Sequence, residues 1–270
     1  MNQTAIRRWA PWVALVVLFS IITSLLSWWQ FTRREERVIR IEQVLANYDK
    51  PPVEFSELAW SLKSDGQSTK EWTPVYVSGQ YLSDHAVIVR NRPLSGQAGF
   101  LQLVPLLLET GEILMIERGW LPAGSNVTEP QSNPLPQPTT HELVVRLRAP
   151  EPDLGRDRVP GQLASINPAE LKEDLAPFGR VIEDRYGRLV SEEPDYQSAP
   201  MPMPMPSLNE GNHLSYALQW ILFGLMAFGA LIWAYRNDRR IRLEEQGLIT
   251  PKVKRKTQSD LDNEFEDQNQ

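Results

Sequence analysis

The chain has 270 residues, of which 41% are apolar, and this length suits one large domain or two small ones with a sizeable core. It contains no cysteine, which excludes disulfides, thiolate metal sites and cysteine nucleophiles. Its formal net charge of −6 argues against nucleic acid as a partner.

The first predicted element is an apolar run over residues 10–31, which follows Arg7 and Arg8. At about 1.5 Å per residue, this run is long enough to cross a hydrocarbon core about 30 Å thick. Tryptophans at both of its ends suit the two membrane interfaces. A cleaved signal peptide would have a shorter apolar region and a small-x-small pair at its exit, so we predict a transmembrane helix.

Residues 32–212 predict a β-rich domain. An amphipathic helical extension at 32–48 comes first, and a short helix is predicted at 54–62. Strands are predicted at 72–82, 86–89, 100–108, 112–117 and 141–149, a strand pair at 180–190, and a second short helix at 168–176. Because about six or seven strands occur without βαβ alternation, we expect an α+β domain with an antiparallel sheet or a small β-barrel.

A second apolar run covers residues 214–235 and follows the Pro-rich linker 199–207, which reads APMPMPMPS and should stay extended. Gly224 and Gly229 within the run allow close packing against another helix. The segment 236–256 then carries eight Lys/Arg and only three Asp/Glu, and the tail from residue 257 is acidic and expected to be disordered.

This charge pattern predicts the topology through the positive-inside rule. The expected order is a cytoplasmic segment 1–9, a transmembrane helix 10–31, a periplasmic domain 32–212, a transmembrane helix 213–235 and a cytoplasmic tail 236–270. The periplasmic domain holds 18 Lys/Arg and 26 Asp/Glu. Four arginines just after the first helix oppose this orientation, but the C-terminal basic cluster is larger and decides it.

Spaced motifs carry a resemblance to a known family. They read R-N-R-P-L-x-G-Q-x-G-F at 90–100, V-P-L at 104–106, R-G-W-x-P at 118–122, W-Q followed by basic residues at 29–34, and H-L-x-Y-A-x-Q-W at 213–220. This order resembles the surfeit locus protein one family, whose members are membrane-bound assembly factors for haem-copper cytochrome oxidase. The residue before R-G-W, usually Asn in that family, is Glu117 here.

The resemblance implies a role in the biogenesis of a respiratory complex. A member would assist the insertion or retention of haem a in the catalytic subunit of an aa3-type cytochrome c oxidase. Its expected partners are that subunit and membrane lipid, with haem a synthase as a further candidate. No mitochondrial transit peptide is visible, which favours a bacterial inner membrane. No Walker loop, G-x-S-x-G motif or clear acid–base pair is found, so we expect no enzymatic activity.

The start of the second apolar helix holds the candidates for haem contact. His213, Tyr216 and Trp220 recur at i, i+3 and i+7 and therefore share one helix face. Imidazole is a common axial ligand of haem iron, and the resemblance implies a haem a contact, because the corresponding His is implicated in haem a binding in bacterial members. The alternative is structural, with His213 capping the helix at the membrane interface and the two aromatic residues joining the aromatic belt.

Three arginines near predicted strand ends are candidates for contact with a partner or an anion: Arg90, Arg92 and Arg118. Their guanidinium groups suit planar anions such as carboxylates and propionates. The alternative, which we favour for each arginine singly, is an ion pair with an acidic residue of the same region: Asp84, Glu109 or Glu112. Trp120 is likewise expected to cap the sheet rather than bind a ligand.

No metal site is predicted. His85 and His141 are isolated histidines in strand contexts. The linker methionines Met201, Met203 and Met205 offer thioethers that suit Cu(I), although such a linker can equally rest on the domain or membrane surface. Cu(I) handling, and a cofactor-free scaffold that binds a nascent oxidase subunit, are therefore the alternatives to a haem a role.

Overall fold

The computed structural model describes residues 3–63, 66–125, 128–156, 159–194 and 198–250, so the predicted acidic tail lies outside the described part of the chain. The chain divides into two compact units. Among the described residues, one unit is helical and contains residues 3–35 and 211–250, and the other is β-rich and lies within residues 36–210.

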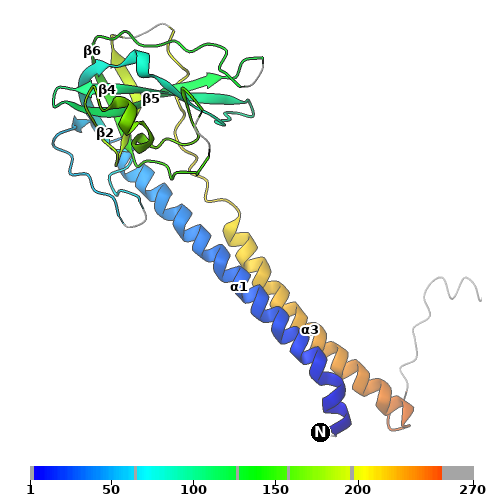
Figure 1. Ribbon diagram of the computed structural model, residues 1–270. Coiled ribbons are helices and arrows are strands. Elements are labelled where there is room, and N and C mark those ends of the chain that lie inside the picture. Colours follow the sequence, from blue (N-terminus) through cyan, green and yellow to red (C-terminus); the bar gives the residue numbers. More distant parts are fainter. Residues whose placement is uncertain (1–2, 64–65, 126–127, 157–158, 195–197, 251–270) are drawn as a thin grey trace, which may run out of the picture. The chain divides into compact units, whose positions relative to one another are not determined.

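The helical unit is formed by two long helices, α1 (Gln3–Asn47) and α3 (His213–Glu245), which run side by side in Figure 1. Each is long and apolar enough to cross a membrane, as the two apolar runs predict. The helix α1 continues without a break past the apolar run to Asn47. The amphipathic extension predicted at 32–48 is therefore confirmed.

Small and hydroxylic side chains bring α1 and α3 together. Ser27 donates a hydrogen bond from Oγ to the carbonyl oxygen of Ala217 at 3.0 Å. Gly224 faces Thr23 so closely that an added Cβ would lie 3.1 Å from the Thr23 hydroxyl. Such residues let two helix backbones approach within a membrane. Of the two glycines predicted to do this, only Gly224 does, because the position of a Cβ at Gly229 is open.

The β-rich unit is a closed five-stranded barrel. Its strands are β2 (Pro74–Tyr81), β4 (Gly99–Leu108), β5 (Glu112–Pro122), β6 (Thr140–Arg148) and β9 (Tyr186–Glu193). They pair in the order β2–β4–β5–β9–β6 and back to β2, with β5 and β9 parallel and the other pairs antiparallel. This confirms the predicted α+β domain with a small barrel.

Several short elements pair with the barrel strands or pack on them. They are β1 (Val53–Glu54), β3 (Val87–Val89), β7 (Gln162–Leu163), β8 (Arg180–Val181), the 3₁₀ helices η1 (Ser83–His85) and η2 (Pro168–Leu171), and α2 (Lys172–Leu175). Asn167 caps η2, since its side chain accepts a hydrogen bond from the Ala169 N–H at 3.2 Å. The helical turn predicted at 168–176 is therefore confirmed, as 3₁₀ followed by α.

The barrel strands differ in how many of their faces are buried. β2 and β6 alternate buried and exposed side chains, and their inward residues fill the barrel interior together with Val104, Leu106, Leu114 and Ile116. β4 and β5 are buried on both faces, because η2, α2 and β7 cover their outer side. This is why the sequence of β4 and β5 is almost continuously apolar, whereas β2 and β6 show period-two alternation.

Two local predictions are wrong. The helix predicted at 54–62 is absent, because β1 extends alongside β2 and the side chains of Phe55, Leu58 and Trp60 pack on the barrel core. The strands predicted as one pair at 180–190 do not pair with each other, because β8 and β9 both pair in parallel with β5. In both places, contacts with distant strands override the local pattern.

A β-bulge interrupts β5 at the R-G-W motif. Gln102 of β4 lies opposite Gly119, and the next residue, Leu103, lies opposite Glu117, so Arg118 is the extra residue. The strand continues through the bulge to Pro122, which places Arg118 inside the sheet rather than at a strand end. A β-bulge changes the direction in which side chains point. Here it accompanies two consecutive charged residues, Glu117 and Arg118, that are both buried.

Candidate functional sites

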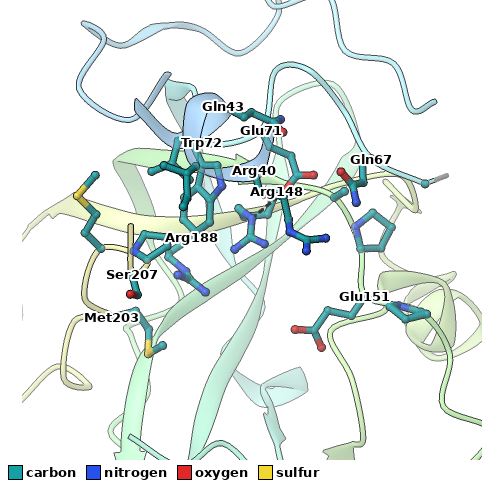
Figure 2. Close-up of a pocket in the computed structure, with 18 of the residues that line it drawn as sticks. Arg40, Gln43, Gln67, Glu71, Trp72, Arg148, Glu151, Arg188, Met203 and Ser207 are labelled. Carbon is teal, nitrogen blue, oxygen red and sulfur yellow. Dashed lines mark hydrogen bonds and ion pairs between the residues drawn. The ribbon is translucent and has the colours of Figure 1, made fainter. Parts of the chain in front are cut away.

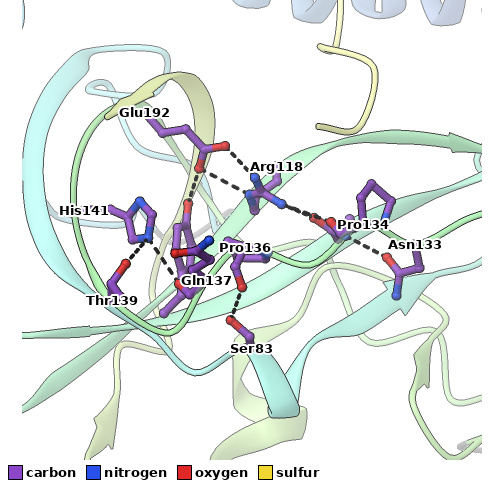
Figure 3. A network of polar contacts seen from close by, with 11 residues as sticks. Ser83, Arg118, Asn133, Pro134, Pro136, Gln137, Thr139, His141 and Glu192 are labelled. Atoms are coloured by element: carbon purple, nitrogen blue, oxygen red, sulfur yellow. Dashed lines mark hydrogen bonds and ion pairs between the residues drawn. The ribbon is translucent and has the colours of Figure 1, made fainter. Parts of the chain in front are cut away.

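Arg118 lies at the centre of a buried polar network (Figure 3). Its guanidinium forms an ion pair with Glu192 of β9, whose second oxygen accepts a hydrogen bond from the Tyr81 hydroxyl at 3.1 Å. The Arg118 Nη1 group also donates to Gln102 Oε1 at 2.8 Å. Burial, together with the negative charge of Glu192, raises the pKa of Tyr81 above its ordinary value, so this phenol stays protonated and donates.

The same network anchors the loop between β5 and β6. The Gln102 amide donates to Asn133 Oδ1 at 2.6 Å and to the Pro134 carbonyl at 2.9 Å. Ser83 donates to the Pro136 carbonyl at 2.7 Å. Because its donors are engaged by protein acceptors, Arg118 serves the fold. The partners suggested for it from the sequence are wrong, since the bulge directs it to Glu192 instead.

Arg92 also forms an internal ion pair. Its two Nη groups contact both carboxylate oxygens of Glu151, one of them at 2.8 Å, and one oxygen also accepts from the Ile166 N–H at 2.9 Å. Partial burial acts to raise the pKa of Glu151, but the hydrogen bonds from Arg92 and Ile166 outweigh it and lower this pKa below its ordinary value. The ion pair predicted for Arg92 is found, but its partner is Glu151 and not one of the acidic residues suggested from the sequence. Arg90 lines a hollow of about 720 Å³ with Arg92 and Phe100.

The remaining residues of the R-G-W motif hold the Pro-rich linker. Trp120 is buried, donates from its indole N–H to the Arg92 carbonyl at 2.6 Å, and pairs through its backbone with Met201. Gly119 has φ +152°, and an added Cβ would lie 2.5 Å from the Met201 carbonyl oxygen. The motif therefore allows the linker to approach β5 closely, and Trp120 packs in the core as predicted for a sheet cap.

The linker methionines do not all face the same hollow. Met201 lines a hollow beside Trp120 and Asn133, whereas Met203 and Met205 line a different cavity. Among the residues that the structure describes, no group of three or more His, Asp or Glu side chains is placed to hold a metal ion.

The predicted haem-contact residues lie at the start of α3. The His213 ring nitrogen Nδ1 lies 2.9 Å from Gln30 Oε1 on α1. Trp220 is half-buried and its ring contacts Phe223 edge-on at 5.8 Å, whereas Tyr216 is 50% exposed. Of these three residues, only His213 has a polar partner on the other helix within the part of the chain that the structure describes. Gln30 was not among the predicted site residues, although it stands in the W-Q motif at the end of the first apolar run.

Sequence reasoning also missed a cluster of arginines on the barrel. Arg148 and Arg188 contact the same aromatic ring, that of Trp72, with guanidinium carbons 3.9 and 5.2 Å from its centre. Arg188 also pairs with the buried Glu117 at 3.0 Å. Burial raises the pKa of Glu117, against the opposing effect of Arg188. The sequence pattern that could have indicated this cluster is the alternation in residues 141–149, which places Arg146 and Arg148 on one face of a strand.

Comparison with known proteins gives consistent matches. The model of the SURF1 family matches residues 17–225, a span that contains the barrel and reaches into both long helices. An uncharacterised SURF1-like protein of Mycobacterium bovis is 29% identical over 252 residues, which cover 90% of this chain and 89% of the relative. A SURF1-like protein of Rickettsia bellii is 25% identical over 246 residues, covering 87% of this chain and 93% of the relative. A SURF1-like protein of Dictyostelium discoideum is 26% identical over 123 residues, 44% of either chain.

Proposed function

Because this chain belongs to the SURF1 family, we propose that it is an assembly factor for an aa3-type haem-copper cytochrome c oxidase and assists the insertion or retention of haem a. The family is generally associated with cytochrome oxidase assembly. Haem a is the cargo in this proposal. The partners are the catalytic subunit of the oxidase, haem a synthase and the surrounding lipid.

The hydrogen bond between His213 and Gln30 carries the haem part of the proposal. An amide oxygen only accepts, so Nδ1 of His213 is the donor, and the neutral ring keeps a lone pair on Nε2. Histidines that ligate metals commonly donate their other ring N–H to an acceptor, which fixes the tautomer and the ring orientation. This arrangement fits imidazole ligation of haem iron, with His213 as the ligand and Gln30 as its positioning residue.

The test is the visible spectrum of the full chain, purified in detergent from membranes that make haem a. We expect a Soret band and a reduced α band in the wild type, and the loss of both in His213→Ala. Gln30→Leu should lower the haem occupancy without abolishing it, because the ligand remains but its tautomer is no longer fixed. His85→Ala is the matched control, since it removes a histidine whose ring packs on Phe178 in the barrel unit.

Other outcomes separate the alternatives. A haem band that survives His213→Ala would move the ligand to another residue. A wild-type protein without a band, but with oxidase subunits co-purifying, would favour the cofactor-free scaffold. For Cu(I) handling, the test is replacement of the three linker methionines by leucine; unchanged oxidase activity would exclude that role.

We further propose that both termini lie in the cytoplasm and that the barrel lies in the periplasm of a bacterial inner membrane. The chain has no cysteine, so single cysteines introduced at the exposed positions Gln131 and Gln246 report on the two sides. In intact cells, a membrane-impermeant maleimide should label Gln131→Cys and leave Gln246→Cys unlabelled. The reverse pattern would invert the topology.

A further inference from the structure

A cavity of about 860 Å³ lies on the β-rich unit (Figure 2). Its walls come from the last turns of α1, the segment before β2, the loop after β6, one residue of β9 and the Pro-rich linker. A volume of this size is typical of sites that bind small molecules. Neither His213 nor Gln30, the residues of the proposed haem contact, lines this cavity.

Three arginines from separate elements point into this cavity: Arg40 of α1, Arg148 of β6 and Arg188 of β9. Arg148 donates from Nε to Glu71 at 3.0 Å, and Arg188 donates from Nε to Glu117 at 3.0 Å. Within the described residues, these are their only hydrogen bonds, so the terminal Nη groups of both arginines are left to face the cavity.

The ring of Trp72 holds the two barrel arginines in place. It is 7% exposed and adopts a positive φ of 70°, a conformation that is rare for a bulky residue. Stacking of Arg148 and Arg188 on this ring fixes their direction before any ligand arrives. A preformed pair of guanidinium groups suits an anion with several oxygens, such as a phosphate.

The helix α1 adds positive charge that no carboxylate neutralises. Within the described residues, Arg37 donates to two carbonyl oxygens, those of Ser207 and Asn209, each at 3.1 Å. Across the described part of the chain, no carboxylate lies within salt-bridge distance of Arg37 or Arg40. Two of the three acidic residues in the cavity wall are already engaged, Glu71 by Arg148 and Glu151 by Arg92, and the third is Asp153. Four arginines against three carboxylates leave the wall with a small surplus of positive charge.

Part of the remaining lining is apolar, and two of the walls lie a few residues along the chain from the apolar runs. The apolar members include Ile41, Val44, Leu62, Met203 and Met205. Arg37 follows the last apolar residue of the first run by six positions on the same continuous helix, which is about 9 Å at 1.5 Å per residue. Ser207, on another wall, precedes the first residue of α3 by six positions.

From these observations we propose that the cavity binds the phosphate headgroup of an anionic phospholipid. Arg40, Arg148 and Arg188 contact the phosphate, Arg37 contributes charge at the rim, and the apolar lining receives the start of the acyl chains. Juxtamembrane arginines are attracted to anionic lipid in the same way, but this site adds a fixed pocket and so predicts a defined stoichiometry of one headgroup.

The test is native mass spectrometry of the full chain in detergent, titrated with phosphatidylglycerol or phosphatidylcholine. Wild-type protein should bind one phosphatidylglycerol in clear preference to phosphatidylcholine. Arg37→Gln/Arg40→Gln should weaken that binding about tenfold. It should change the melting temperature little, because neither arginine has an ionic partner to lose among the described residues and the two hydrogen bonds of Arg37 to carbonyl oxygens are exposed. The matched control is Arg236→Gln/Arg239→Gln, which removes the same charge from the exposed basic segment after the second apolar run and should leave that binding unchanged.

Three results would overturn the proposal. The first is an unchanged preference for phosphatidylglycerol in Arg37→Gln/Arg40→Gln. The second is an equal loss in the control variant, which would assign the preference to general attraction by basic residues. The third is displacement of the lipid by inorganic phosphate at the same concentration, which would make the cavity a site for a free anion.

Discussion

Arg118 and Glu192 form an ion pair inside the barrel, with only 1% and 4% of their side chains exposed. They meet because Arg118 is the extra residue of the β5 bulge, which turns it toward β9. The Tyr81 hydroxyl completes the site by donating to Glu192 at 3.1 Å. Arg118, a candidate from the sequence for anion contact, instead forms an internal ion pair of the kind that we favoured for it, and this pair is part of the structural core.

Removing one member of this pair should strongly destabilise the barrel. Arg118→Leu leaves the Glu192 carboxylate buried without its cation, which typically costs about 3–5 kcal/mol. The double variant Arg118→Leu/Glu192→Leu should cost less than the single one, since no isolated charge remains. Urea unfolding of the full chain in detergent measures both, and a double variant that equals the sum of the two single variants would contradict the pairing.

Gly119→Ala should loosen the Pro-rich linker. The new Cβ would meet the Met201 carbonyl at 2.5 Å, and alanine is strained at φ +152°. We expect a loss of about 2 kcal/mol and faster protease cleavage within residues 199–207. Gly96→Ala is the control, because its φ is also positive at +81° but its Cβ would meet nothing within 4 Å. Equal cleavage in both variants would show that backbone strain alone, and not the contact with Met201, is responsible.

Glu151→Gln should reduce the sensitivity of the protein to acid. The pKa of Glu151 is lowered in the folded state, so its carboxylate stabilises the fold above its unfolded pKa of about 4.3, and this stability is lost as the pH falls below that value. At pH 7 the variant should be less stable by about 1 kcal/mol. The difference from wild type should shrink below pH about 4, as measured by melting temperature; a constant difference would be inconsistent with this shift.

Glu117→Gln should show the opposite pH dependence. The pKa of Glu117 is raised in the folded state by burial, so the folded protein binds this proton more tightly than the unfolded chain. Wild type should therefore lose stability relative to the variant as the pH rises above about 4.3 toward the folded pKa. The comparison of melting temperatures across this range tests the sign directly, and a wild type that gains stability over the variant would refute it.

Local periodicity predicted the strands well. The alternation in residues 72–82 and 141–149 and the apolar runs around Gly111 are set by which faces are buried, and each pattern lies within one segment. The length of the apolar runs likewise predicted two long apolar helices. These features needed no knowledge of distant neighbours.

The ion pairs were not predictable in the same way. Arg118 and Glu192 are 74 positions apart, and His213 and Gln30 are 183 apart. Their meeting depends on barrel closure, on a one-residue bulge and on helix pairing, none of which has a local pattern. A shift of one residue in register would send Arg118 to the other face of the sheet, so carboxylates close to it in the sequence were poor guides to its partner.

Closure of the barrel limits how another protein can recognise it. Each of the five barrel strands is paired on both sides, and within the described residues the strands at the ends of the pairing order, β1 and β7, are two residues long, as is β8. Binding by addition of a strand needs a longer run of unpaired backbone N–H and C=O groups. Any protein that binds the barrel must therefore engage its side-chain surfaces and loops, and the same closure protects the domain from edge-to-edge aggregation.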